Sequence, residues 1–316
     1  MHRRDFVRGA VVAAAGSTLR PRSGPPTVRL DALAYRSRRR LTPTPFGRVA
    51  HVEHGRGPAA LFIHGYPLNG FQWRGALERL ADVRRCLAPD LLGLGYSEAE
   101  PALDLTADTQ AAMLAAWLDA LGVDAVDVVA NDSGGAVAQL LTARHPARVR
   151  SLLLTNCDVH VNSPPAALRP AIAQARAGAF ARDFLAPQLA DPRRARTPQG
   201  LGGLAYTDPT HFTDECVSYY LAPLLATPER RAAAERYLTA FEPNPLPAIE
   251  PLLRRTTVPA RMLWGTGDAL FGVEWAYWLD RTLPSSRGVR LVEGAKLFFP
   301  EELPHVIAEE ARRLWS

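Results

Sequence analysis

Residues 128–141 read VVANDSGGAVAQLL, and this segment constrains the fold more than any other part of the chain. Small and β-branched residues come first, two polar residues and two glycines follow, and an apolar run with helical spacing comes next. Only a very tight turn fits between such a strand and such a helix. This strand–turn–helix unit is typical of a parallel α/β sheet, where it presents one side chain at the carboxyl end of the strand.

The residue at the apex of this turn is predicted from the size of its neighbours. A turn this tight needs small residues two positions before its apex and two and three positions after it. For Asp132 these positions hold Ala130, Gly134 and Gly135, whereas for Ser133 the first of them is an asparagine. The sequence therefore favours Asp132 over Ser133 as the apex residue. The alternative is an ordinary turn in which Asp132 caps the helix.

Short apolar strands alternate with amphipathic helices along most of the chain. The pattern indicates helices over 106–122 and 273–282. This alternation predicts a mostly parallel sheet that is covered by helices on both faces. The expected strands are 48–53, 59–63, 86–90, 125–130, 149–155, 260–264 and 289–292.

Residues 159–255 break this rhythm. The segment is rich in proline, alanine and arginine, and it contains helical patterns without a convincing strand. We expect a helical lid that lies over the ends of the sheet strands. The predicted organisation is a basic N-terminal arm over 1–40, a core made of 41–158 and 256–316, and the lid between the two parts of the core.

The charge of the chain is concentrated in the first 40 residues. The net charge is +5, but residues 1–40 hold ten arginines and two aspartates, which leaves the remainder at −3. A body with this balance argues against a nucleic-acid partner. Arg3 and Arg4, followed by Phe6, Val7 and a small-residue apolar stretch, resemble a twin-arginine export signal; the alternative is a basic start of a cytoplasmic protein. No later run reaches the ~18 apolar residues of a membrane span, so no integral membrane segment is expected.

Two further motifs identify a family. The segments LFIHGYP (61–67) and APDLLGLGYSE (88–98) follow strands, and with VVANDSGG they closely resemble the α/β-hydrolase fold over residues 45–316. The resemblance is to the epoxide-hydrolase and haloalkane-dehalogenase branch. It implies an eight-stranded, mostly parallel sheet with a helical lid. In this branch an aspartate attacks carbon to form an alkyl-enzyme ester, and a water activated by histidine hydrolyses the ester.

The resemblance assigns roles to several residues. Asp132 would be the nucleophile, and the backbone N–H groups of Tyr66 and Ser133 would form the oxyanion hole. Asp268 stands where the triad acid of the family follows its strand, although it could instead cap the next helix. His64 belongs to the oxyanion loop, and Trp73 is expected to face the substrate.

Departures from the pattern narrow the branch. Haloalkane dehalogenases commonly hold the halide with a tryptophan and an asparagine at the positions of Ser133 and Tyr66, so halide release is disfavoured here. Epoxide hydrolases use lid tyrosines as donors to the epoxide oxygen. The lid offers Tyr219 and Tyr220, with Tyr206 and Tyr237 nearby, although lid tyrosines often serve only in packing.

The histidine of the triad is missing from its expected place. The segment EGAKLFFPEELP (293–304) matches the family on both sides, and the histidine position is Leu297. Lys296, the only lysine among 37 basic residues, precedes it. We expect its amine to lie near Asp132 and Asp268 in the charged form, as a proton donor or an anchor for an anionic substrate. His160, which follows the strand 149–155, is an alternative base.

These observations favour an α/β-hydrolase-fold enzyme that uses Asp132 on a small apolar or anionic organic substrate and is closest to epoxide hydrolases. The main alternative is a non-hydrolytic isomerase, cyclase or lyase that uses Asp132 and Lys296. A haloalkane dehalogenase or an inactive binding protein fits less well. A small-molecule substrate is the expected partner; no cofactor or metal is expected, and the oligomeric state is not predicted.

Overall fold

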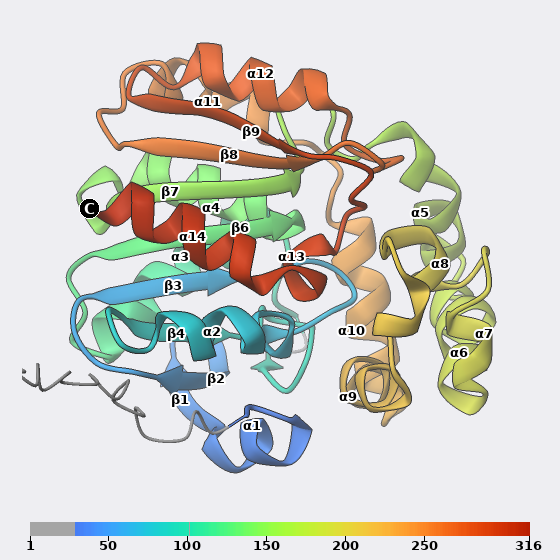
Figure 1. Ribbon diagram of the computed structural model, residues 1–316. Helices are drawn as coiled ribbons and strands as arrows, with labels where there is room; N and C mark the ends of the chain where they lie inside the picture. The colour runs from blue at the N-terminus through green and yellow to red at the C-terminus, as the bar shows by residue number, and fades with distance from the viewer. Residues whose placement is uncertain (1–28, 101) are drawn as a thin grey trace, which may run out of the picture.

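The computed structural model describes residues 29–100 and 102–316, and within these residues nine strands form one sheet (Figure 1). The strand order is β1-β2-β4-β3-β6-β7-β8-β9, with β5 paired to β2. The run from β4 to β9 is parallel, while β1, β2 and β5 pair antiparallel at one edge. The strands are β1 Arg40–Thr44, β2 Gly47–His54, β3 Ala59–Ile63, β4 Arg85–Pro89, β5 Glu98–Ala99, β6 Val126–Asp132, β7 Val149–Cys157, β8 Ala260–Gly265 and β9 Ser286–Val292.

The strands expected from apolar runs are all present, and the mostly parallel α/β-hydrolase sheet is confirmed. Sequence analysis missed β1 and β5. The β1 segment, RLTPT, contains a proline and no apolar alternation, and β5 is only two residues long. Both strands form because β2 offers them backbone hydrogen-bond partners. Such pairing depends on the tertiary structure, so a local sequence pattern does not predict it.

Helices cover both faces of the sheet. Helices α2 and α14 pack together on one face, whereas α3, α4 and α11 pack together on the other (Figure 1). The fully buried Trp73, Trp117 and Trp264 belong to one continuous apolar core. Together with α12 and α13, the helices around the sheet are α2 Arg74–Leu80, α3 Ala107–Ala120, α4 Ser133–Arg144, α11 Leu246–Leu253, α12 Val273–Thr282, α13 Phe299–Glu302 and α14 Pro304–Trp315.

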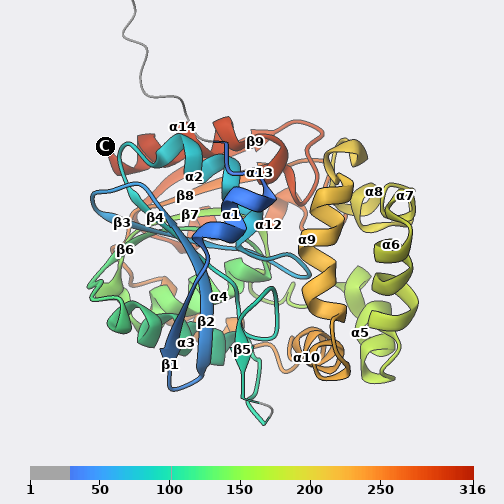
Figure 2. The same cartoon turned by 90° about the horizontal axis from the view of Figure 1, so that it is seen from below.

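The segment between β7 and β8 is helical, and most of it stands at one end of the sheet (Figures 1 and 2). We call α5 to α10 the cap helices. The last helix of the segment, α11, instead packs on α4, because Leu246, Ile249 and Leu253 form a buried apolar face. Part of the expected lid, 159–255, is therefore core. The cap helices are α5 Arg169–Arg176, α6 Ala186–Ala190, α7 Pro192–Ala195, α8 Leu201–Ala205, α9 Asp214–Leu225 and α10 Pro228–Thr239.

Short helical turns complete the structure. Most of them are single 3₁₀ turns at the ends of strands or at the starts of longer helices, and η4 is a π-helical turn. They are η1 Gly70–Trp73, η2 Pro146–Arg148, η3 Ala166–Leu168, η4 Ala181–Leu185 and η5 Pro209–His211.

The end of the expected basic arm belongs to the folded domain. Residues Ala32–Arg38 form α1, which is capped by the Asp31 side chain and touches cap helix α9. Tyr35 of α1 is buried, with its ring centroid 5.2 Å from that of Phe71 and 6.0 Å from that of Tyr219. The arm boundary at residue 40 is corrected for this reason. The twin-arginine-like residues lie outside the described part of the chain.

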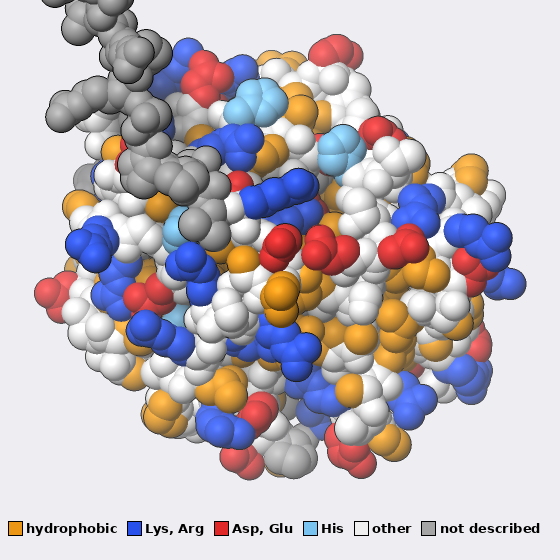
Figure 3. Space-filling model, turned by 60° about the horizontal axis from the view of Figure 1, so that its bottom comes forward, with side chains coloured by type: hydrophobic (Ala, Val, Ile, Leu, Met, Phe, Trp, Pro, Cys, Tyr) orange, Lys and Arg blue, Asp and Glu red, His pale blue; other side chains and the backbone are white. Residues whose placement is uncertain are grey.

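Within the described residues, no helix has the length and apolar character that crossing a membrane requires. On the face of the molecule in Figure 3, basic and acidic side chains are interspersed. Ion pairs between arginine and acidic side chains, such as Arg48 with Glu98 at 2.6 Å, recur over the surface.

Candidate active site

Asp132 is the last residue of β6, and α4 begins at the next residue. Its backbone has φ 54° and ψ −134°, a conformation that residues other than glycine rarely adopt. The glycines that follow make this turn possible. A Cβ on Gly134 would lie 2.4 Å from the backbone oxygen of His64, and one on Gly135 would lie 2.3 Å from the Cβ of Cys157. The small-residue argument from the sequence thus has a direct steric basis, and the turn places Asp132 at its apex.

Two backbone N–H groups act on the Asp132 carboxylate. The N–H of Tyr66 donates to Oδ2 at 2.8 Å, and the N–H of Ser133 lies close enough to lower the pKa of the carboxyl group. These are the two groups that the sequence places in an oxyanion hole. Gly65 lets the loop approach, because a Cβ there would lie 2.2 Å from the same Oδ2. The carboxylate is therefore fixed in one orientation by the loop after β3 and by the start of α4.

His64 supports this loop and does not face the substrate cavity. The N–H of Leu91 donates to its Nε2 at 2.9 Å, and its Nδ1 lies 2.9 Å from the backbone oxygen of Gly65. Burial lowers the pKa of His64 to about 4, so the ring is neutral and its Nδ1–H donates to Gly65. Its assignment as a substrate-binding residue is corrected: it ties the loop that carries Tyr66 to the loop after β4.

A cavity of about 390 Å³ opens beside Asp132, between the sheet and the cap helices. Most of its wall is aliphatic or aromatic, and Asp132 and Asp268 are the carboxylates in it. Sites for small organic molecules commonly combine such an apolar wall with a few polar groups. Its lining residues are Tyr66, Pro67, Asp132, Ala167, Leu168, Pro170, Ala171, Gln174, Phe180, Phe184, Leu201, Leu204, Ala205, Phe241, Asp268, Ala269, Leu270, Leu297 and Phe298.

Asp268 follows β8 and is held firmly at the cavity wall. The side-chain amide of Asn156 donates to its Oδ2 at 2.9 Å, and the N–H of Leu270 donates to its Oδ1 at 2.8 Å. Burial raises the pKa of Asp268 to about 6, while these donors act in the opposite direction. A carboxyl group with this pKa is mostly ionised at neutral pH and can accept or release a proton near pH 6.

The electrostatics of Asp132 are set by burial and by other acids. Burial raises the pKa of its carboxyl group well above the usual range, and the charge of Asp158 adds to the rise. The two backbone donors lower the pKa, and Asp268 raises it further. The neighbourhood is thus rich in carboxyl groups, and protons are retained there to higher pH than on exposed aspartates.

Sequence analysis missed Asp158. It is fully buried just after β7, and burial raises its pKa to about 7, only partly offset by the Ser163 hydroxyl and its own backbone N–H. A signal for it was available, because Asp158 directly follows a buried strand that is adjacent to β6, and Cys157 pairs in register with Asp132. Polar residues at the carboxyl ends of adjacent parallel strands lie close together.

Lys296 lies apart from the carboxylates. Its Nζ donates to the backbone oxygen of Gly203 in cap helix α8 at 2.7 Å, and its own N–H donates to Thr207 at 3.1 Å. It is not part of the cavity wall. The expectation that its amine acts beside Asp132 and Asp268 is therefore corrected: this side chain fastens the cap to the core.

Leu297, the neighbour of Lys296 in sequence, does line the cavity. It is 5% exposed, and its backbone oxygen accepts a bond of 3.0 Å from the side-chain amide of Asn131. Among the residues that the structure describes, no histidine stands in the cavity wall.

Two cap tyrosines bind a buried glutamate rather than facing the cavity. The hydroxyls of Tyr206 and Tyr220 donate to Glu301 of α13 at 2.5 and 2.9 Å, and Arg74 of α2 forms an ion pair with the same carboxylate. The Glu301 side chain is only 3% exposed. Tyr220, expected to contact the substrate, is thus a docking residue that fixes the cap to the core.

The other two cap tyrosines also point elsewhere. The hydroxyl of Tyr219 accepts a hydrogen bond from Arg39, and that of Tyr237 lies 3.1 Å from the Ser133 Oγ. Among the described residues, Tyr66 is the one tyrosine in the cavity wall. The assignment of Tyr219 and Tyr220 as substrate contacts is therefore corrected.

Trp73 and His160 are also displaced from the expected site. Trp73 is fully buried and packs on Phe62, with ring centroids 5.7 Å apart. His160 Nε2 lies 2.9 Å from a carboxylate oxygen of Glu250, and its ring lies over that of Trp278. Neither Trp73 nor His160 belongs to the cavity wall, so the expectation of His160 as an alternative base is corrected.

Comparisons with known proteins agree with this architecture. Haloalkane dehalogenase 2 of Mycobacterium tuberculosis is 29% identical over 285 residues, which cover 83% of this chain and 89% of that protein. Epoxide hydrolase 1 of Siraitia grosvenorii is 32% identical over 202 residues, which cover 55% of this chain and 63% of that protein. The crystal structure of haloalkane dehalogenase DbeA from Bradyrhizobium elkani superposes with a TM-score of 0.71 at 26% identity, covering 88% of this chain and 98% of that one. Residues 58–303 match the family described as alpha/beta hydrolase fold, and the chain belongs to this family.

Proposed function

We propose that this protein is a hydrolase that attacks an electrophilic carbon of a small uncharged organic molecule with the Asp132 carboxylate. One observation carries this proposal: a strained turn presents Asp132, fixed by the N–H groups of Tyr66 and Ser133, in the wall of a largely apolar cavity of about 390 Å³. A turn with φ 54° at an aspartate costs free energy, and such strain clusters at functional sites. It is therefore unexpected in a protein that only binds.

The cavity wall supports an uncharged substrate. Among the described residues, neither lysine nor arginine lines it, while Asp132 and Asp268 do. An anionic molecule would lose its hydration and meet carboxyl groups, so the anionic substrate considered from the sequence is disfavoured. The relatives named haloalkane dehalogenase and epoxide hydrolase support an uncharged substrate with an electrophilic carbon.

An epoxide fits this site better than an alkyl halide. Ser133 and Tyr66 contribute backbone N–H groups to Asp132, and the Ser133 hydroxyl faces Tyr237 rather than the cavity. A departing halide ion would therefore have few donors. An epoxide oxygen stays attached to the product and needs only a proton. The Asp268 carboxyl, whose pKa is about 6, supplies it in those molecules in which Asp268 is protonated and Asp132 is ionised.

The reaction then balances with the two cavity carboxyl groups and water. An oxygen of Asp132 bonds to an epoxide carbon, the carbon–oxygen bond of the ring breaks, and the ring oxygen takes the proton of Asp268. Water next attacks the carbonyl carbon of the ester while Asp268 accepts the proton. The tetrahedral intermediate collapses, and the proton of its new hydroxyl passes to the departing alkoxide. The diol leaves, Asp132 is regenerated as a carboxylate with one oxygen from water, and Asp268 is again protonated. Asp268 takes the role of base that a histidine would have at position 297.

The second candidate is a catalyst that forms the ester but does not hydrolyse it efficiently. Leu297 in the cavity wall favours this candidate, because an aliphatic side chain cannot activate water. The reaction would then end in isomerisation, cyclisation or elimination. Lys296 has no part in it, since its Nζ is bound to Gly203.

Mass spectrometry after incubation with styrene oxide in H₂¹⁸O distinguishes these cases. The hydrolase gives diol, an adduct on the peptide that contains Asp132, and ¹⁸O in the Asp132 carboxyl group after one turnover. An adduct that accumulates without diol indicates the second candidate. If wild-type protein forms neither adduct nor diol while retaining its fold, the proposed function is wrong. Asp132→Asn, which keeps the size of the side chain, is the control and is expected to form no adduct.

A further inference from the structure

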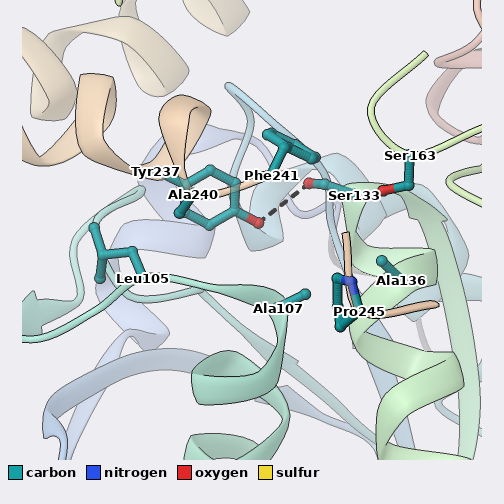
Figure 4. A pocket seen from close by; sticks show the side chains of 9 residues that line it. All are labelled: Leu105, Ala107, Ser133, Ala136, Ser163, Tyr237, Ala240, Phe241 and Pro245. Carbon is teal, nitrogen blue, oxygen red and sulfur yellow. Dashed lines mark hydrogen bonds between the residues drawn. The ribbon is translucent and has the colours of Figure 1, made fainter. Parts of the chain in front are cut away.

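Tyr237 of cap helix α10 touches both residues whose backbone N–H groups hold Asp132. Its hydroxyl lies 3.1 Å from the Ser133 Oγ, and its ring stacks on that of Tyr66, with centroids 5.7 Å apart and an interplanar angle of 13°. Figure 4 shows the hydroxyl of Tyr237 directed to Ser133. One side chain of the cap therefore contacts the loop after β3 and the start of α4 at once.

Tyr237 does not itself face the substrate cavity. It lines a separate small crevice together with Ser133 and Ser163, whose hydroxyls make part of the crevice wall polar (Figure 4). Tyr237 is only 4% exposed, and its ring lies between those of Tyr66 and Phe241, the latter at a centroid distance of 6.0 Å. These two neighbours do line the substrate cavity. Tyr237 thus sits behind the cavity wall, between the substrate side and the turn.

We propose that Tyr237 is a positioning residue through which cap helix α10 holds the backbone N–H groups of Tyr66 and Ser133 in place at the Asp132 carboxylate. The inference rests on the proposed function, since it concerns the same carboxylate. Tyr237 acts through Tyr66 and Ser133 and touches no reacting atom. Ring stacking fixes Tyr66 from one side, and the hydroxyl bond fixes Ser133 from the other. The cap is then part of the machinery that orients Asp132, as well as a cover for the cavity.

Ordinary packing of a cap tyrosine is the competing explanation, and the chain offers a matched control for it. Tyr220 of α9 is also a buried cap tyrosine with a bonded hydroxyl, but its partner is Glu301. Tyr237→Phe and Tyr220→Phe each remove one buried hydroxyl and keep the ring. A general weakening of cap docking affects both variants alike, whereas a positioning role affects only Tyr237→Phe.

The experiment measures two quantities on wild-type protein, Tyr237→Phe, Tyr220→Phe, Ser133→Ala and the Tyr237→Phe/Ser133→Ala double variant. The first is the titration of the Asp132 carboxyl carbon by NMR with ¹³C-labelled aspartate, assigned with Asp132→Asn. Asp158 and Asp268 face Asp132, and Glu235 faces Tyr66, so their titrations are followed in the same spectra where they are labelled. The second is the rate of ester formation with styrene oxide, separated into kcat and KM.

We expect Tyr237→Phe to raise the titration midpoint of Asp132, because looser donors stabilise its carboxylate less. We also expect kcat for ester formation to fall about fivefold with KM unchanged, as one hydrogen bond typically contributes. Ser133→Ala is expected to give the same change, and the double variant no more than either single one. Tyr220→Phe is expected to lower stability without moving the midpoint.

An unchanged Asp132 midpoint in Tyr237→Phe, or an equal shift in Tyr220→Phe, would overturn the inference. The titration does not depend on catalysis. If no ester forms in the wild-type protein while the midpoint shifts in Tyr237→Phe only, the proposed function fails and the positioning role stands. If the ester forms and the midpoint does not shift in Tyr237→Phe, the proposed function stands and the positioning role fails.

Discussion

Asp268 and Leu297 line the same cavity, and each is anchored by an asparagine near the end of a sheet strand. Asn156 of β7 donates to the Asp268 carboxylate, and Asn131 of β6 donates to the Leu297 backbone oxygen. The cavity wall thus contains the Asp268 carboxylate and the aliphatic side chain of Leu297, at the position where the family resemblance predicts a histidine. In a carboxylate–histidine pair, the acid orients the ring and stabilises its charged form. Here the cavity wall holds the Asp268 carboxylate, and residue 297 of the same wall is a leucine.

This relationship leads to the first prediction, that Leu297→His accelerates hydrolysis of the Asp132 ester. An imidazole at this position would face Asp268 and the cavity, and its ordinary pKa suits a general base at neutral pH. We expect about 100-fold faster decay of the styrene oxide adduct, followed by mass spectrometry of quenched samples. Leu297→Met, which keeps an apolar side chain of similar size, is the control. Equal adduct lifetimes in both variants would show that the position does not reach the ester.

The second prediction concerns Asp268 in the wild-type protein. Asp268→Asn keeps the size of the side chain and an acceptor for the Leu270 N–H, but it cannot take a proton from water. We expect both steps to slow: adduct formation, because an amide cannot protonate the epoxide oxygen, and hydrolysis of any adduct that forms, by about 100-fold or more. Diol formation is measured by chromatography and folding by thermal unfolding. A stable variant with normal diol formation would exclude Asp268 as the base.

The tight turn at Asp132 shows what a sequence can predict about a site. The choice of Asp132 over Ser133 depended on Ala130, Gly134 and Gly135, and the observed clashes of a Cβ at the two glycines give the reason. Such constraints are local, since they act within a few residues of one turn. For the same reason the apolar strands were found, while β1 and β5, which depend on a partner strand, were not.

Lys296 shows where this reasoning stops. Lys296 attracted attention because it is the only lysine among 37 basic residues. This rarity does not tell where its side chain points. Consecutive side chains leave the backbone on different sides, and here Leu297 takes the cavity while Lys296 turns to Gly203. The expected substrate contacts of Tyr219 and Tyr220 are corrected for a similar reason. The hydroxyls of the cap tyrosines are placed by how the cap docks on Glu301, Arg39 and Ser133, which are far away in sequence.

The third prediction is a fall of stability with rising pH caused by Asp158. Burial raises the pKa of Asp158 to about 7 in the folded protein, whereas the unfolded chain has the ordinary value near 3.8. Between these values the folded state retains a proton that the unfolded state releases, so the free energy of unfolding falls as pH rises from about 4 to 7. The three-unit difference corresponds to about 4 kcal/mol.

Asp158→Asn removes this titration. We expect the variant to match the wild-type protein near pH 4 and to be more stable than it at pH 8, as measured by urea unfolding at both values. Asp132 and Asp268 also have raised pKa values, so a smaller fall with pH remains in the variant. Parallel stability curves for the two proteins would contradict a buried, uncompensated Asp158.

The last prediction tests how the cap is fastened to the core. Glu301 accepts hydrogen bonds from Tyr206 and Tyr220 of the cap and pairs with Arg74 of the core, at a side-chain exposure of only 3%. Glu301→Gln removes the charge and leaves the Arg74 guanidinium without its carboxylate, so we expect the free energy of unfolding to fall by about 3 kcal/mol. Urea unfolding measures this loss. Glu98→Gln, which breaks the exposed pair with Arg48, is the matched control and is expected to change stability by less than about 1 kcal/mol. Equal losses in both variants would show that the buried network does not hold the cap.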